Sequence, residues 1–295
     1  MYPLPAQNSK MLPGLPLPEF LKKKKQPEPI TENEKRRPEP TTADGNKELA
    51  EEHLAKGRVH QAITRYKKAA HMENTPGHRT DLGDAYAFAE LPLKALQQYR
   101  RALKSNPNTP EPHFSLAEVY TRYGKWRAAI AEYSRAVELD PCNAFYRYKL
   151  AFAYTQVTCT LDAIAQLQEA VKISPKDPFY RFELASLHAD IRQDQDAVNQ
   201  MECAFALSPA DDYYAVRLAM LYARTGSLER AGDLYREAIR LEPAKLAYRY
   251  LLADIYASLG YEDRAQSEYA GAAEIDHYDA DFIRRARRFM LGGRW

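Results

Sequence analysis

Residues 144–177 read AFYRYKLAFAYTQVTCTLDAIAQLQEAVKISPKD, and residues 178–211 read PFYRFELASLHADIRQDQDAVNQMECAFALSPAD. Both stretches place tyrosine, arginine, leucine, alanine and proline at the same positions. Prolines extend this period of 34 residues along the chain, at Pro107, Pro141, Pro175, Pro209 and Pro243. A period of this length is typical of stacked supersecondary units, so the stretch predicts a repeat protein.

Alignment on the prolines yields seven repeats, which start near residues 43, 76, 110, 144, 178, 212 and 246. The seventh residue of every repeat is leucine, and the eighth is alanine or glycine. Alanine also fills positions 20 and 27, with a large residue, most often tyrosine, at position 24. Spacings of three and four residues put these side chains on one face of a helix. Position 11, which is tyrosine or histidine, extends the same period to the first half, so each repeat is predicted to hold two helices.

The two helices of a repeat are separated by a predicted turn. Gly57, Gly124, Gly226 and Gly260 stand at this point, where a residue with positive φ ends a helix at low steric cost. Small residues at the helix crossings let the backbones approach closely, and large residues fill the space between them. Antiparallel helix pairs that stack in this way form a solenoid.

These columns resemble the tetratricopeptide repeat, which has small residues at positions 8, 20 and 27, large ones at 11 and 24, and proline at 32. The resemblance covers residues 43–278. It implies an all-α, right-handed solenoid of about seven helix-turn-helix repeats and a non-catalytic scaffold or adaptor that binds proteins. One column departs from the family, because arginine replaces the bulky residue at position 4 and tyrosine precedes it in several repeats. The departure predicts that the aromatic wedge is shifted by one residue.

The region before the repeats, residues 1–42, is rich in proline and contains the basic runs Lys22–Lys25 and Arg36–Arg37. Proline removes a backbone donor and restricts its neighbour, so this region is predicted to be a disordered tail. Leu12–Leu21 is apolar, and two hypotheses remain open for it. It either occupies the binding groove of its own chain or remains in solvent, where it could dock another protein.

Residues 279–295 are predicted to form a capping helix and the C-terminal end. Along Asp281–Met290, Ile283, Ala286 and Met290 share one side, and the arginines lie mostly elsewhere. A solenoid needs a polar outer face at its end, which this helix would supply. A basic amphipathic helix could also contact a membrane or nucleic acid.

Composition narrows the function classes. The net charge is only +2, so there is no basic surplus to favour a nucleic-acid partner. The three cysteines lack disulfide or zinc spacing, which predicts reduced thiols and a cytoplasmic protein. No apolar run approaches the ~20 residues that a transmembrane segment needs. No catalytic or phosphate-binding motif is found, so we expect no enzyme activity, no cofactor, no metal and no small-molecule substrate.

Positions 2, 5, 9, 12 and 13 of each first helix share an arc opposite the packing face. In tetratricopeptide repeat proteins this arc lines the concave groove. Here it is polar in the first two repeats and aromatic from the third onward, which predicts that a partner peptide or helix with apolar anchors binds there. The candidate peptide-binding residues are Phe114, Phe145, Tyr148, Phe152, Phe179, Phe182, Tyr213, Met220 and Tyr250, with the polar neighbours Glu118, Arg122, Asp190, Arg224 and Asp254.

Three further interpretations concern the role of this arc and the alternatives to it. Individual rings could instead pack against adjacent first helices. Chaperone-binding relatives hold a terminal carboxylate with lysine and asparagine, but here Lys47 is alone and Glu51 would repel the carboxylate, so no carboxylate-clamp chaperone partner is predicted. The alternative function is an assembly factor associated with nucleic acid or a membrane surface, through Lys22–Lys25, Arg36–Arg37 and the C-terminal arginines.

Overall fold

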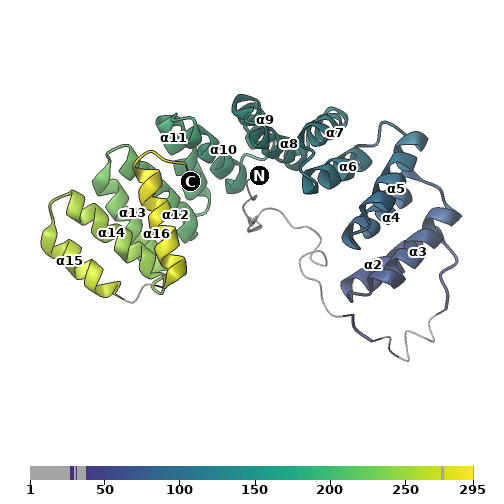
Figure 1. Cartoon of the computed structure of the whole chain (residues 1–295), viewed down its shortest axis with the longest axis horizontal. Helices are drawn as coiled ribbons and strands as arrows, with labels where there is room; N and C mark the ends of the chain where they lie inside the picture. Colours follow the sequence, from purple (N-terminus) through teal and green to yellow (C-terminus); the bar gives the residue numbers. More distant parts are fainter. Residues whose placement is uncertain (1–26, 30, 32–37, 274–275, 295) are drawn as a thin grey trace, which may run out of the picture. The chain divides into compact units, whose positions relative to one another are not determined.

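The computed structural model describes residues 27–29, 31, 38–273 and 276–294. These residues form fifteen helices and no strands. The chain divides into an N-terminal unit, Met1–Tyr123, and a C-terminal unit, Gly124–Trp295, and each is described by itself (Figure 1). The helices of the N-terminal unit are α2 Ala43–Ala55, α3 Val59–Met72, α4 Pro76–Phe88, α5 Pro92–Ser105 and α6 Pro110–Arg122.

The C-terminal unit continues the alternation of 14- and 13-residue helices as far as α14, and its α15 has 10 residues. Its helices are α7 Trp126–Leu139, α8 Ala144–Gln156, α9 Thr160–Ile173, α10 Pro178–Asp190, α11 Asp194–Leu207, α12 Asp212–Arg224, α13 Leu228–Leu241, α14 Leu246–Ser258, α15 Glu262–Gly271 and α16 His277–Met290. Consecutive helices pack against one another from α2 to α6 and from α7 to α15, so each helix pair also stacks on the next. The fold is an all-α solenoid of helix pairs.

The alanine columns form the floor of every helix pair. All fourteen alanines at positions 20 and 27 are at most 2% exposed, and Tyr99, Tyr133 and Tyr235 at position 24 are fully buried between them. A tyrosine ring fits there only because its neighbours are small. In the second repeat even alanine is too large at position 8, since a Cβ on Gly83 would lie 2.3 Å from Cε1 of Tyr99.

Every repeat turns at position 15 with a positive φ. The predicted glycines fill this position in four repeats, but Glu90, Thr158 and Arg192 fill it in the others, at φ of 60°, 62° and 64°. In six of the repeats the residue after the turn donates its N–H to the carbonyl of position 11; in the fourth repeat, Cys159 donates to Tyr154 at 3.0 Å. This bond closes the helix end, so the backbone geometry is kept even without glycine.

The arginine column at position 4 joins the two helices of a repeat. Each of these arginines donates to a side-chain oxygen of position 23, nineteen residues on, at 3.0–3.3 Å. The pairs are Arg79–Gln98, Arg147–Gln166, Arg181–Gln200 and Arg249–Glu268. The preceding tyrosines Tyr146, Tyr180 and Tyr248 are buried, so an aromatic ring fills the core one residue earlier than in the family pattern.

Part of the predicted tail contacts the first repeat. The buried side chain of Arg58 donates to the carbonyls of Glu28 and Pro29, each at 2.6 Å, and Glu28 donates its N–H to Lys56 O at 3.1 Å. Glu39 pairs with arginine and lysine side chains of α3. The apolar segment Leu12–Leu21 and the tail's two basic runs lie outside the described residues.

The residue at position 15 should set part of the stability. A β-branched residue with positive φ is strained by about 1–2 kcal/mol, which exceeds the about 0.4–1 kcal/mol of unfolded-chain entropy that glycine adds. We expect Thr158→Gly to raise the free energy of unfolding in urea by about 1 kcal/mol. The control is Gly226→Thr, because a Cβ there meets no atom within 4 Å, and it should lower that free energy by about 1–2 kcal/mol. Destabilisation by Thr158→Gly would contradict this account.

Candidate peptide-binding face

The predicted binding arc lies on the first helices, and we call this side of α8, α10, α12 and α14 the first-helix face. Four half-buried rings on α8 and α10 form what we call the aromatic strip: Phe145, Tyr148, Phe152 and Phe179. The ring of Tyr148 lies 4.8 Å from that of Phe179 and 6.2 Å from that of Phe145, and Phe152 packs edge-on against Trp126 at 6.1 Å. The rings therefore support one another while part of each surface remains accessible.

Beyond the strip, the first-helix face is covered by α16, which packs against both α12 and α14 (Figure 1). The helix begins after Asp276, whose side chain accepts from the N–H of Asp279 at 2.8 Å. Ile283, Ala286 and Phe289 are buried in the same apolar cluster as α12 and α14. The sequence indicated Ile283 and Ala286 for this buried side but missed Phe289.

Two of the predicted contact residues are covered in this structure. Met220 is completely buried, and Phe182 is only 7% exposed. Both belong to the cluster that includes α16, and the ring of Phe182 also packs against Tyr213 at 5.4 Å. Their positions in the repeat face outward as predicted, yet both side chains are buried within this cluster. Tyr213 and Tyr250, from the same arc, are half-buried.

Two polar residues of the arc, Asp254 and Arg224, are bound by other parts of the same unit. Asp254 accepts two hydrogen bonds from Arg287 of α16, from Nε at 2.8 Å and from Nη2 at 2.6 Å. The guanidinium of Arg287 also lies 4.8 Å from the ring centre of Tyr250, and Tyr269 donates its hydroxyl to Asp254 at 2.6 Å. The hydrogen bonds to Asp254 raise the pKa of Arg287, so this two-point ion pair holds α16 at α14.

On α12, two arginines enclose an aromatic ring of α16. The guanidinium of Arg224 lies 4.2 Å from the ring centre of Phe289, and that of Arg217 lies 5.3 Å from it. Arg224 also donates from Nη2 to Asp194 at 2.6 Å. Burial lowers the pKa of both arginines and raises that of Asp190, so the face carries desolvated charges of both signs.

The remaining predicted site residues, Phe114, Glu118 and Arg122, lie on α6 of the N-terminal unit. Phe114 and Glu118 are half-buried, and Arg122 is exposed. Arg122 donates from Nη1 to the carbonyl of Ala87 at 3.1 Å. This bond attaches the end of α6 to the end of α4, so Arg122 has a structural contact in addition to its predicted role.

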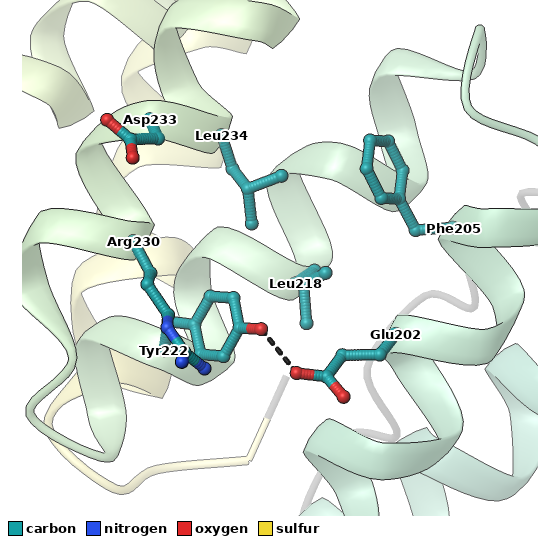
Figure 2. Close-up of a pocket in the computed structure, with 7 residues that line it drawn as sticks. All are labelled: Glu202, Phe205, Leu218, Tyr222, Arg230, Asp233 and Leu234. Atoms are coloured by element: carbon teal, nitrogen blue, oxygen red, sulfur yellow. Dashed lines mark hydrogen bonds between the residues drawn. The ribbon is translucent and has the colours of Figure 1, made fainter.

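The structure also contains a pocket that the sequence did not indicate (Figure 2). Its volume is about 320 Å³, and residues of α11, α12 and α13 line it: Glu202, Phe205, Leu218, Tyr222, Arg230, Asp233 and Leu234. The Tyr222 hydroxyl donates to Glu202, and Arg230 lies over the tyrosine ring. Leu218 and Tyr222 occupy the core columns at positions 7 and 11. The repeat pattern predicts that such residues face the core, but it does not show whether other side chains fill the space beside them.

No group of three or more His, Cys, Asp or Glu side chains in the described part of the chain could hold a metal ion. Among the described helices, none has the length and apolar character needed to cross a bilayer.

Family comparisons agree with the geometry. The tetratricopeptide repeat profiles match residues 47–110, 213–245 and 246–277, and a TPR repeat profile matches residues 119–157. The chain is a tetratricopeptide repeat protein. This fold is generally a scaffold for protein interactions. No curated protein sequence matches the chain.

Solved structures share the fold at low identity. PilF of Pseudomonas aeruginosa is 17% identical with a TM-score of 0.58 and covers 72% of this chain and 97% of its own. A tetratricopeptide repeat protein of Parabacteroides merdae is 18% identical with a TM-score of 0.55, covering 84% and 98%. YrrB, described as a TPR protein with an unusual peptide-binding site, is 19% identical with a TM-score of 0.53, covering 63% and 97%.

The carboxyl group of Glu183, on α10 beside Arg217, should make stability depend on pH. Burial raises its pKa from 4.5 to about 7, against a smaller opposing effect of Arg217, and its Oε1 has no hydrogen-bond partner among the described residues. Between pH 4.5 and 7 the folded state therefore binds more protons than the unfolded state, and stability falls as the pH rises.

We expect Glu183→Gln to raise the free energy of unfolding by about 1–3 kcal/mol at pH 8 and to change it little at pH 4. Urea denaturation at both pH values measures the difference. Glu138→Gln is the control, since this side chain is 64% exposed, and it should not change the pH dependence. An equal effect of Glu183→Gln at both pH values would show that the carboxyl does not titrate in this window.

Proposed function

We propose that this protein is a non-catalytic scaffold or adaptor that binds a segment of a partner protein on the aromatic strip of α8 and α10. The observation that carries the proposal is the accessible part of this strip. Phe145, Tyr148, Phe152 and Phe179 lie outside the columns that build the repeat. Tyr148 contacts the rings of Phe145 and Phe179, and Phe152 contacts the ring of Trp126. Aromatic side chains in such positions are typical anchors of protein interfaces.

The geometry of the strip favours an apolar partner segment. Rings held edge-on by their neighbours lose little side-chain entropy on binding, which favours affinity. Lys149, whose Nζ lies 5.5 Å from the ring centre of Phe145, adds a cation at the edge. The ligand class that fits is an extended or helical peptide with large apolar anchors and an acidic neighbour. A peptide-binding site on a related fold, that of YrrB, is consistent with this class.

The rival function, association with nucleic acid or a membrane surface, has less support. The basic runs of the tail lie outside the described residues. Among the C-terminal arginines, Arg287 is bound to Asp254, and Arg284 pairs with Asp281 at 2.9 Å. A cytoplasmic location is part of the proposal, on the basis of the three exposed free cysteines.

A double substitution tests the strip. We expect Phe152→Ala with Phe179→Ala to weaken partner binding at least about tenfold, because the loss of each ring removes about 1 kcal/mol or more of binding free energy. The measurement is quantitative affinity purification from cells of the source organism, followed by titration of the captured protein. The control is Phe205→Ala, which removes a ring from the pocket on α11 to α13. Full binding by the folded double variant, or equal loss in the control, would contradict the strip as the site.

Salt dependence separates the two functions. Displacing counterions from phosphates lowers affinity about 10³-fold or more between 50 and 200 mM salt when six or more contacts are made. A partner held by aromatic anchors should lose less than about threefold over that range. Titrating the captured partner at both salt concentrations measures this. A steep loss would favour the basic segments as the binding surface.

A further inference from the structure

Helix α16 lies on the first-helix face in the way that a bound ligand would. It contacts α12 and α14, the first helices of two successive repeats. Its contact residues Ile283, Ala286, Arg287 and Met290 follow the i, i+3, i+4, i+7 spacing of a helix bound in an apolar groove.

Two specific contacts hold α16 in place. Arg287 makes the two-point ion pair with Asp254, and the ring of Phe289 lies between the guanidinium groups of Arg217 and Arg224. The arginine and the aromatic residue are two positions apart. The arginine binds a carboxylate on α14, and the aromatic ring packs against two guanidinium groups on α12. The surface beneath α16 is therefore specific for a helix that carries arginine followed two residues later by an aromatic side chain.

The fit beneath α16 is incomplete. The side chain of Arg224 is only 2% exposed, and its Nε and Nη1 have no hydrogen-bond partner among the described residues. A buried polar group left without a hydrogen bond destabilises the folded state. Burial also lowers the pKa of Arg224 and Arg217, which is the mark of guanidinium groups removed from water. An apolar ring cannot accept these hydrogen bonds, whereas a carboxylate or amide could.

We propose that α16 is an exchangeable internal ligand, and that the face of α12 and α14 is a second binding subsite for an amphipathic helix of a partner protein. That helix presents the arginine and aromatic pair of α16 together with a hydrogen-bond acceptor for Arg224. Partner binding requires α16 to leave. Because the tethered helix competes for the same surface, only a helix with higher affinity for that surface displaces it. This inference rests on the proposed function, because it also assigns partner binding to the first-helix face.

The probe for this subsite is a labelled synthetic peptide with the sequence of residues 276–294, added to the full-length chain. Arg287→Glu places two carboxyl groups opposite each other at Asp254 and should release α16. We expect that variant to bind the peptide at least about tenfold more tightly than the unmodified chain, where the tethered helix competes at an effective concentration of about 1 mM. A peptide with Phe289→Ala should not bind.

A charge exchange supplies the matched control. In Arg287→Glu with Asp254→Arg, the ion pair is restored in reversed order, so α16 should dock again. A peptide that carries Arg287→Glu should then bind this double variant as weakly as the unmodified peptide binds the unmodified chain. Circular dichroism confirms that each variant keeps its helices. A folded Arg287→Glu chain that does not bind the peptide overturns the proposal.

Hydrogen exchange of the unmodified chain provides a measurement that needs no variant. If α16 is exchangeable, its amides exchange at least about tenfold faster than those of α12 and α14. Equal protection of the three helices would make α16 a permanent part of the fold and overturn the proposal. The aromatic strip is separate, because Phe152→Ala with Phe179→Ala should leave binding of this peptide unchanged.

Discussion

The close approach of the two helices in each repeat is the constraint on which the rest of the structure depends. Alanine at positions 20 and 27 leaves room for the ring or large side chain at position 24. In most repeats the two alanines and this large side chain are fully buried. Because this contact uses one side of each helix, the opposite side of every first helix is left without a packing role. The binding face is therefore a consequence of how the helix pairs close, and its side chains can vary without changing the fold.

Periodicity made the fold predictable, since the columns repeat the same contact seven times. The helix starts and the position of the turn follow from it. Periodicity does not predict a packing contact that occurs only once in the chain. Met220 and Phe182 occupy positions that face outward in every repeat, and both are buried in the apolar cluster that also includes residues of α16. The aromatic strip on α8 and α10 was predictable because no later segment among the described residues is seen to cover it.

The same distinction explains the departures from the family pattern. The arginine at position 4 was visible as a column, but its partner at position 23 was not, because glutamine and glutamate there resemble ordinary surface residues. Thr158 and Arg192 take the turn conformation that glycine takes elsewhere, since the hydrogen bonds of the helix end impose it. In both cases a backbone or side-chain hydrogen bond determines the structure, and residue type alone does not reveal it.

The charges beneath α16 argue for a surface that meets water. A permanently covered face would be at least as stable with apolar residues of similar size, because removing paired charges from water costs several kcal/mol per ion. Yet Arg217 and Arg224 lie under the ring of Phe289, and Glu183 and Asp190 are buried enough for their pKa values to rise. If α16 exchanges as proposed, such charges would keep the face soluble when the helix is absent. They also discriminate among partner helices, since a helix that leaves them unpaired binds poorly.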